Sequence, residues 1–268
     1  MPTALTQNVI NSLGEFTDFI EDALRHAEGT AWYRGVGVAE YRLVPSLYRH
    51  PEKRAMDDLR EIEGEIINRF KQRCVPYLSR PLGDEWDHLF LMQHFGVPTR
   101  LLDWTENPYI ALYFALTTTP RDEATGEYTA DAAVWSLAPI RWNAHALQHL
   151  RVSSILSPND SRLDGYAPGV EMRLMNSEPV AIYGTHNSPR IVAQRGAFTI
   201  FGRNVEPLED TYAVREFPQD CLTKVVLPRE HIPLLLQSLV RIGFSDSVVF
   251  PDLDGLAKEL KRFYGFRV

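Results

Sequence analysis

Apolar residues recur at helical spacing in the first third of the chain. Residues 14–27 have this pattern, and Pro51–Cys74 predicts a longer amphipathic helix. The apolar side chains expected on one face of this longer helix are Leu59, Ile62, Ile66 and Phe70. Between the two helices, the run "AWYRGVGV" over residues 31–38 predicts a strand.

The central part of the chain predicts a helix, a short strand and a second helix. Glu85–Phe95 is the first helix, which Gly96 is suited to end because glycine readily adopts left-handed backbone angles. The strand is "TRLLDW". The second helix, "NPYIALYFAL", has Asn107 as its N-cap and Pro108 at its first position. It is apolar almost all round, so we expect it to lie deep in the fold.

Strand-like runs dominate the rest of the chain. They are "DAAVWSL", "EPVAIYG", "GAFTIFG" and "LTKVVLP", and the polar stretch 139–177 predicts loops with short helices. The end predicts a helix over 229–242, the strand "SVVF" and a helix over 252–263. The sequence therefore predicts one α+β domain, in which helices at the N-terminal half and the C-terminus surround a β-rich core. Residues 1–30 form an N-terminal helical segment in this prediction, followed by the main domain over 31–268.

Composition excludes some classes of protein. The chain has 268 residues and a net charge of −7, which argues against a general nucleic-acid binder that works by neutralising phosphates. Cys74 and Cys221 lie at no metal-ligand spacing and predict reduced structural thiols. The N-terminus lacks the pattern of a signal peptide and no run is long enough to cross a membrane, so we expect a cytoplasmic protein without membrane contact.

The first candidate for binding chemistry is the "YRG" sequence at the end of the first strand. Arg34 offers a planar fork of donors that matches phosphate or carboxylate. Gly35 would let a ligand approach the backbone closely. The alternative is a surface arginine in a turn or a structural salt bridge.

The second candidate lies where a strand runs into a helix, at Thr105 and Asn107. Free backbone N–H groups at a helix start favour anions, although simple helix capping explains both residues as well. Asp103 interrupts a buried run and needs a partner, for which Arg34 and Arg100 are the natural candidates.

Further polar residues stand near these segments. Gln93 and His94 end the helix before the same strand, and Gln194 stands at the mouth of an apolar strand. Each has a structural alternative, either a hydrogen-bonded histidine or a turn residue. No His or Cys spacing predicts a zinc site, so we expect no metal. The sequence also has no phosphate-loop, dinucleotide-binding or serine-hydrolase motif. A nuclease or other hydrolase is therefore the weakest alternative.

Together these segments resemble the FRG-domain family, named for an aromatic-Arg-Gly motif. The resemblance rests on "YRG", "QHFGVPTRLLDWTENPYIALYFA", "RIVAQRGAFTIFG" and "VVFPDLDGLAKEL", and it identifies residues 31–268 as an FRG domain. The layout is also similar to ADP-ribosyltransferases of the Arg-Ser-Glu type. That likeness implies the fold of those enzymes, with Arg34 on the phosphates of NAD and Thr105 at the second motif.

The third motif of those enzymes carries a glutamate, and here Gln194 stands in its place. The resemblance therefore implies catalytic roles for Arg34, Asp103 and Gln194, with Asp103 supplying the negative charge that glutamine lacks. NAD contacts are expected from Arg34, Gly35, Gln93, His94, Arg100, Thr105 and Asn107.

The function implied is that of an NAD-binding ADP-ribosyltransferase or NAD glycohydrolase, as in a bacterial toxin or phage-defence effector that modifies nucleic acid or protein. The alternative is a non-catalytic module that senses a nucleotide or nucleic acid, since a glutamine at the third motif is compatible with loss of activity. The sequence specifies neither the acceptor of ADP-ribose nor the oligomeric state.

Overall fold

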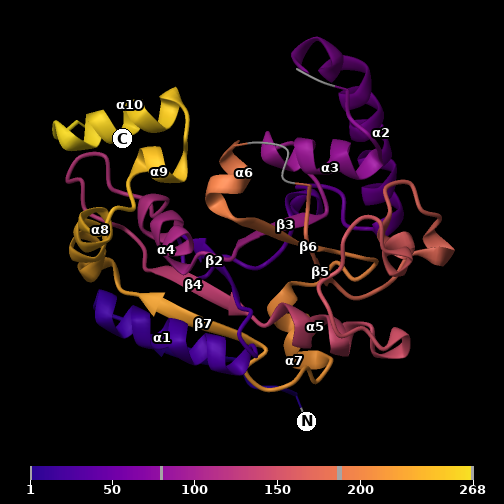
Figure 1. Ribbon diagram of the computed structural model, residues 1–268, viewed down its shortest axis with the longest axis horizontal. Helices are drawn as coiled ribbons and strands as arrows, with labels where there is room; N and C mark the ends of the chain where they lie inside the picture. The colour runs from indigo at the N-terminus through magenta and orange to yellow at the C-terminus, as the bar shows by residue number, and fades with distance from the viewer. Residues whose placement is uncertain (1, 79–80, 186–188, 267–268) are drawn as a thin grey trace.

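The computed structural model describes residues 2–78, 81–185 and 189–266 (Figure 1). Its strands are β1 (Thr6–Val9), β2 (Trp32–Val36), β3 (Leu101–Thr105), β4 (Ala132–Leu137), β5 (Val180–Ile182), β6 (Gly196–Ile200) and β7 (Leu222–Leu227). Its α-helices are α1 (Leu13–His26), α2 (Met56–Cys74), α3 (Glu85–His94), α4 (Pro108–Thr117), α5 (Pro139–Ala146), α6 (Pro189–Gln194), α7 (Leu208–Val214), α8 (Ile232–Arg241), α9 (Asp246–Val249) and α10 (Leu253–Phe263).

The strands of the described ranges form one mixed sheet in the order β1-β7-β4-β2-β3-β6-β5. β1 is parallel to β7, and the other neighbours are antiparallel. At the centre of the sheet, β2 and β3 are joined through a single described residue pair, Tyr33 with Thr105. The two strands diverge beyond that pair, so the sheet opens between a part made of β1, β7, β4 and β2 and a part made of β3, β6 and β5.

Helix α4 packs directly onto β2, and glycines make this close approach possible. A Cβ atom added to Gly35 would lie 1.9 Å from the carbonyl oxygen of Ala111 and 2.6 Å from the amide nitrogen of Ala115. A Cβ atom on Gly37 would lie 2.3 Å from the backbone of Thr118. Gly35 therefore allows α4 to approach the backbone of β2 closely, a packing role that the sequence did not indicate.

Two hydrophobic clusters support the two parts of the sheet. The larger one surrounds α4, β2, β4 and β7 and includes Trp32, Leu112 and Trp135. The smaller one surrounds β5 and β6 and includes Phe90 and Phe198. In Figure 1, α1, α4 and α8 gather on one side of the molecule, and α2 and α3 stand on the other, above β3 and β6.

The predicted architecture of one domain with helices around a β-rich sheet is confirmed. The predicted helix starts and stops in the centre are also confirmed, because the Asn107 side chain accepts from the Tyr109 N–H and Gly96 has a φ of 73°. Helix α4 is buried over most of its length, as its composition predicted.

Four predictions about elements are wrong or incomplete. The run "SVVF" forms the helical turn α9 and not a strand, because the preceding Asp246 is buried and held by Tyr113 and Arg262. The first thirty residues contain β1 as well as a helix. Helix α2 starts at Met56, and its buried side includes Glu63. Helices α6 and α7 were not predicted.

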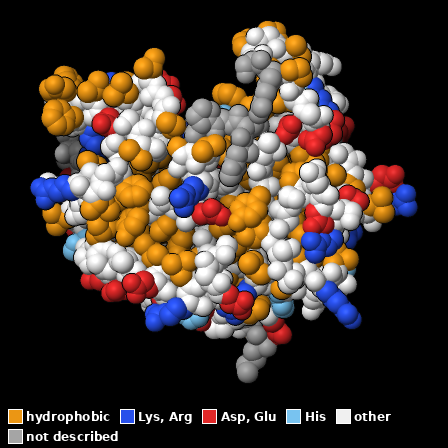
Figure 2. All heavy atoms as spheres, in the orientation of Figure 1, with side chains coloured by type: hydrophobic (Ala, Val, Ile, Leu, Met, Phe, Trp, Pro, Cys, Tyr) orange, Lys and Arg blue, Asp and Glu red, His pale blue; other side chains and the backbone are white. Residues whose placement is uncertain are grey.

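Helix α10 lies at the surface with an apolar outer side. Leu253 and Phe263 are 82% and 79% exposed, and Figure 2 shows hydrophobic side chains gathered at this corner of the molecule. Among the described helices, none combines the length and apolar character that a membrane span requires.

Candidate functional site

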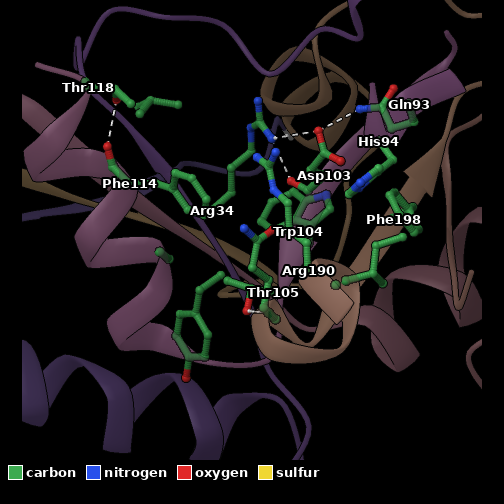
Figure 3. Close-up of a pocket in the computed structure, with 18 of the residues that line it drawn as sticks. Arg34, Gln93, His94, Asp103, Trp104, Thr105, Phe114, Thr118, Arg190 and Phe198 are labelled. Atoms are coloured by element: carbon green, nitrogen blue, oxygen red, sulfur yellow. Dashed lines mark hydrogen bonds and ion pairs between the residues drawn. The ribbon is translucent and has the colours of Figure 1, made fainter. Parts of the chain in front are cut away.

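A cavity of about 380 Å³ lies where β2 and β3 diverge (Figure 3). This volume is in the range of small-molecule sites. Its walls come from β2, β3, β6, the end of α3, one side of α4 and helix α6. The predicted site residues that line it are Arg34, Gly35, Gln93, His94, Asp103, Thr105 and Gln194. Residues more than 150 positions apart in the chain therefore share one cavity.

Arg34 lies at the centre of the cavity with unused donors. Its Nη1 atom donates to the carbonyl oxygen of Asp103 at 2.7 Å and lies 3.9 Å from the carboxylate of the same residue. Its Nε atom is buried and has no hydrogen-bond partner among the described residues. Burial lowers the pKa of Arg34, and the nearby charge of Arg49 lowers it further, while Asp103 opposes the shift. A partly desolvated guanidinium with free donors favours an anionic ligand.

Asp103 faces the cavity and is not buried, which corrects the sequence-based expectation. Its side chain is 57% exposed, although both neighbours on β3, Leu102 and Trp104, are buried. The cavity walls nevertheless raise the pKa of the Asp103 carboxyl by partial desolvation, against the lowering effects of Arg34 and of a hydrogen bond from Gln93. The predicted partnership with Arg34 is confirmed.

Gln93 fixes the orientation of the Asp103 carboxylate. Its amide nitrogen donates to Asp103 at 2.6 Å, and its amide oxygen accepts from the hydroxyl of Thr99. The Gln93 side chain thus has one donor and its acceptor in use within the protein. It can hold the carboxylate in place for a ligand even if it does not touch the ligand itself.

His94 and Arg190 complete the charged lining. Burial lowers the pKa of His94, and the positive charge of Arg190 lowers it further, so the ring is predominantly neutral at pH 7. Arg190 was not predicted as a site residue. It stands four positions before Gln194 in α6, and residues at this spacing share a helix face, so a helical assignment of 189–194 would have indicated it.

Thr105 and Asn107 have local structural roles. The Thr105 hydroxyl donates to the carbonyl oxygen of Gln194 at 2.5 Å and accepts from the Asn107 N–H at 3.0 Å. Because its proton is already used, Thr105 can only accept a hydrogen bond from a ligand. Asn107 caps α4 and is not among the cavity-lining residues.

Arg100 does not reach the cavity, and its predicted contact with the ligand and with Asp103 is wrong. Its side chain is 1% exposed and pairs with Glu63 at 2.6 Å. It also donates to the carbonyl oxygens of Phe201 and Tyr166 at 2.8 and 2.9 Å. Arg100 therefore belongs to a buried network behind β3, which supports the cavity from the protein side.

The cavity has polar residues at its centre and aromatic residues at its edges. Figure 3 shows Arg34 and Asp103 between Phe114 on one side and His94 and Phe198 on the other. Tyr41, which is 60% exposed, also lines the cavity. The described residues contain no group of three or more His, Cys, Asp or Glu side chains placed to hold a metal ion.

The family comparison matches one segment of the chain. Residues 29–124 match the model of the FRG domain, which supports the FRG assignment for the segment with β2, α3, β3 and α4. Searches of curated proteins and of solved structures found no match. Arg190 and Gln194 lie outside the matched segment, as do the motifs around residues 190–202 and 248–260.

Proposed function

We propose that the cavity binds NAD and that the protein is an ADP-ribosyltransferase-like enzyme, which breaks the bond between nicotinamide and ribose. The observation that carries this proposal is the Arg34 guanidinium, which lines the opening of the sheet and, among the described residues, makes a hydrogen bond only to the carbonyl oxygen of Asp103. A phosphate oxygen would supply the acceptor and the negative charge that this group lacks.

The layout of the cavity supports a dinucleotide. NAD has a negatively charged diphosphate at its middle and a flat ring at each end. The cavity has two arginines near its middle and aromatic side chains on both sides, with Phe114 at one edge and Phe198 at the other. Aromatic faces and edges suit the rings, and guanidinium groups suit the diphosphate.

Asp103 is the residue we assign to charge stabilisation. When nicotinamide leaves with the electrons of the glycosidic bond, positive charge develops on the ribose, and a fixed carboxylate stabilises that charge. Gln93 holds the Asp103 carboxylate by a 2.6 Å hydrogen bond, so little reorganisation would be needed. The acceptor, a group on nucleic acid or protein or else water, then bonds to the ribose carbon.

The state of Gln194 favours a second candidate, a binding module without catalysis. Its side-chain amide donates to the carbonyl oxygen of Val249 at 3.1 Å, and it brings no negative charge to the cavity. If Asp103 does not replace that charge, the same cavity would bind a nucleotide without cleaving it.

Release of nicotinamide from NAD by the purified protein tests the proposal. We expect Arg34→Ala and Asp103→Ala to lower kcat/KM by about 100-fold or more, as loss of one stabilising group does in other active sites. Arg173→Ala is the matched control, because Arg173 is 74% exposed and lies outside the cavity. Release that survives Arg34→Ala would refute the site assignment, and NAD binding without any release would favour the binding module.

A further inference from the structure

Arg190 is a cavity residue whose charge is not paired within the described part of the chain. No described residue forms a hydrogen bond or ion pair with its side chain, but its guanidinium carbon lies 4.6 Å from the centre of the Phe250 ring. Its charge lowers the pKa of both His94 and Asp103, so it acts on the same region as Arg34. Asp103 is the carboxylate among the cavity-lining residues, so the two arginines leave an excess of positive charge.

Phe250 belongs to the C-terminal segment, defined here as residues 245–264, which contains α9 and α10. The ring packs edge-on against Phe114 in the cavity wall, with ring centres 5.7 Å apart. Gly255 allows α10 to pass close behind it, because a Cβ atom on Gly255 would lie 2.0 Å from the carbonyl oxygen of Phe250. The Phe250 ring therefore packs against Phe114, and the Phe250 backbone packs against α10.

The C-terminal segment is itself anchored to the body of the protein. Asp246 accepts a hydrogen bond from Tyr113 of α4 at 2.5 Å and pairs with Arg262 of α10. Gln194, at the end of the helix that carries Arg190, donates to Val249 at 3.1 Å. Helix α6 thus contacts this segment through the Gln194 amide and through the Arg190–Phe250 pair.

We propose that Phe250 is a positioning residue that holds Arg190 toward the ligand, and that Arg190 gives the cavity a preference for a diphosphate over a monophosphate. The inference rests on the proposed function in one respect, since NAD carries a diphosphate. Arg34 alone contacts one phosphate group well, and a second guanidinium stabilises the additional charge of a diphosphate. The aromatic face attracts the cation and limits the rotamers of a long, flexible side chain.

Calorimetric titration with ADP and with AMP tests the inference. The wild-type protein should bind ADP at least about 10-fold more tightly than AMP, which is the lower end of what a charge-assisted hydrogen bond contributes. Arg190→Ala should remove most of this preference by weakening ADP binding and leaving AMP binding nearly unchanged. Phe250→Leu should weaken ADP binding by about 3-fold to 30-fold, the range of a cation–π contact.

A double-mutant comparison separates positioning from general damage to the fold. In the Arg190→Ala background, Phe250→Leu should have no further effect on ADP binding. Phe250→Tyr keeps the ring and should retain ADP preference. Lys258→Met is the matched control, because the Lys258 ammonium lies 4.8 Å from the centre of the same ring but is not among the cavity-lining residues. It should change the ADP preference by less than about 2-fold.

Several results would overturn the inference. They are an equal loss of ADP and AMP affinity on Arg190→Ala, an effect of Phe250→Leu that is the same with and without Arg190, and a wild-type protein that binds neither nucleotide or shows no preference. The outcome is independent of the nicotinamide assay. ADP preference without nicotinamide release would refute the enzyme alone, and release without ADP preference would refute this inference alone.

Discussion

The buried pair between Glu63 and Arg100 offers a sharp test of how the cavity wall is held. Glu63→Leu would remove the only carboxylate that pairs with the Arg100 guanidinium within the described residues. The arginine is 1% exposed, so water cannot replace the lost partner without a local rearrangement. The variant therefore leaves a buried charge that is only partly compensated.

The size of the effect follows from the remaining contacts of Arg100. Loss of one partner of a buried ion pair costs about 3–5 kcal/mol of unfolding free energy. Arg100 would keep its hydrogen bonds to two carbonyl oxygens at 2.8 and 2.9 Å, which places the expected loss at the lower end, about 3 kcal/mol. For a domain of this size each kcal/mol shifts Tm by about 2–4 °C, so we expect a decrease of about 6–12 °C.

Thermal unfolding followed by circular dichroism measures this shift. Glu65→Leu is the matched control, because Glu65 lies on the exposed side of the same helix and should change Tm by less than about 2 °C. Glu63→Leu combined with Arg100→Met should recover most of the lost stability, since no buried charge remains. ADP affinity measured well below Tm should be unchanged in each variant. An Arg100→Met variant with wild-type Tm and a 10-fold loss of ADP affinity would refute this reasoning and make Arg100 a ligand contact.

Three further predictions concern the packing and charge of the site. Gly35→Ala should lower the unfolding free energy by about 1–3 kcal/mol or more, because the new Cβ would lie 1.9 Å from the carbonyl oxygen of Ala111 in α4. Gly64→Ala is the control: a Cβ atom there meets no heavy atom within 4 Å, so this variant should be stabilising by up to about 1 kcal/mol. A Gly35→Ala variant with unchanged unfolding free energy in chemical denaturation would contradict the packing. ADP-ribose should bind more tightly in calorimetry as the pH falls from 8 to 5, because a bound anion favours protonated His94, whose pKa is lowered by burial and by Arg190. Protonation of Asp103, whose pKa is raised by desolvation, acts in the same direction because it removes a charge that repels the ligand. His94→Gln should flatten this dependence on pH, and an affinity that falls toward acid pH would oppose the assignment. Tyr113→Phe should lower the unfolding free energy by about 1–3 kcal/mol, since it removes the 2.5 Å hydrogen bond to buried Asp246, and a wild-type midpoint in urea would show that this bond does not hold the C-terminal segment.

Local signals in the sequence were sufficient for elements whose ends depend on nearby residues. Asn107, Pro108 and Gly96 predicted the ends of two helices because capping involves residues only a few positions apart. The prediction of a strand at "SVVF" was wrong although its apolar and β-branched residues favour a strand. Tyr113 and Arg262, which are distant in the sequence, hold Asp246 in place and favour a helical turn there. Strand β1 was missed because "TQNV" is short and polar, as edge strands often are.

The candidate site shows the same division between local and distant causes. Arg34 was predicted from its place at the end of a strand, Asp103 from its interruption of a buried run, and Gln194 from its place at the mouth of an apolar strand. The structure brings all three into one cavity. Arg100 and Asp103 are three positions apart, but Arg100 is buried and Asp103 faces the cavity. The alternation of apolar and polar residues along the strand did not show which of the two would be buried. The contact between Arg190 and Phe250 joins segments 60 positions apart and had no local signal.

The central claim is that Arg34 holds the diphosphate of NAD in the opening between β2 and β3. A crystal structure of the protein soaked with NAD tests it most directly. We predict phosphate oxygens at about 2.7–3.2 Å from the Arg34 guanidinium nitrogens, with the ligand extended between the Phe114 and Phe198 sides of the cavity. NAD bound elsewhere, or a cavity that stays empty at saturating NAD, would contradict the claim.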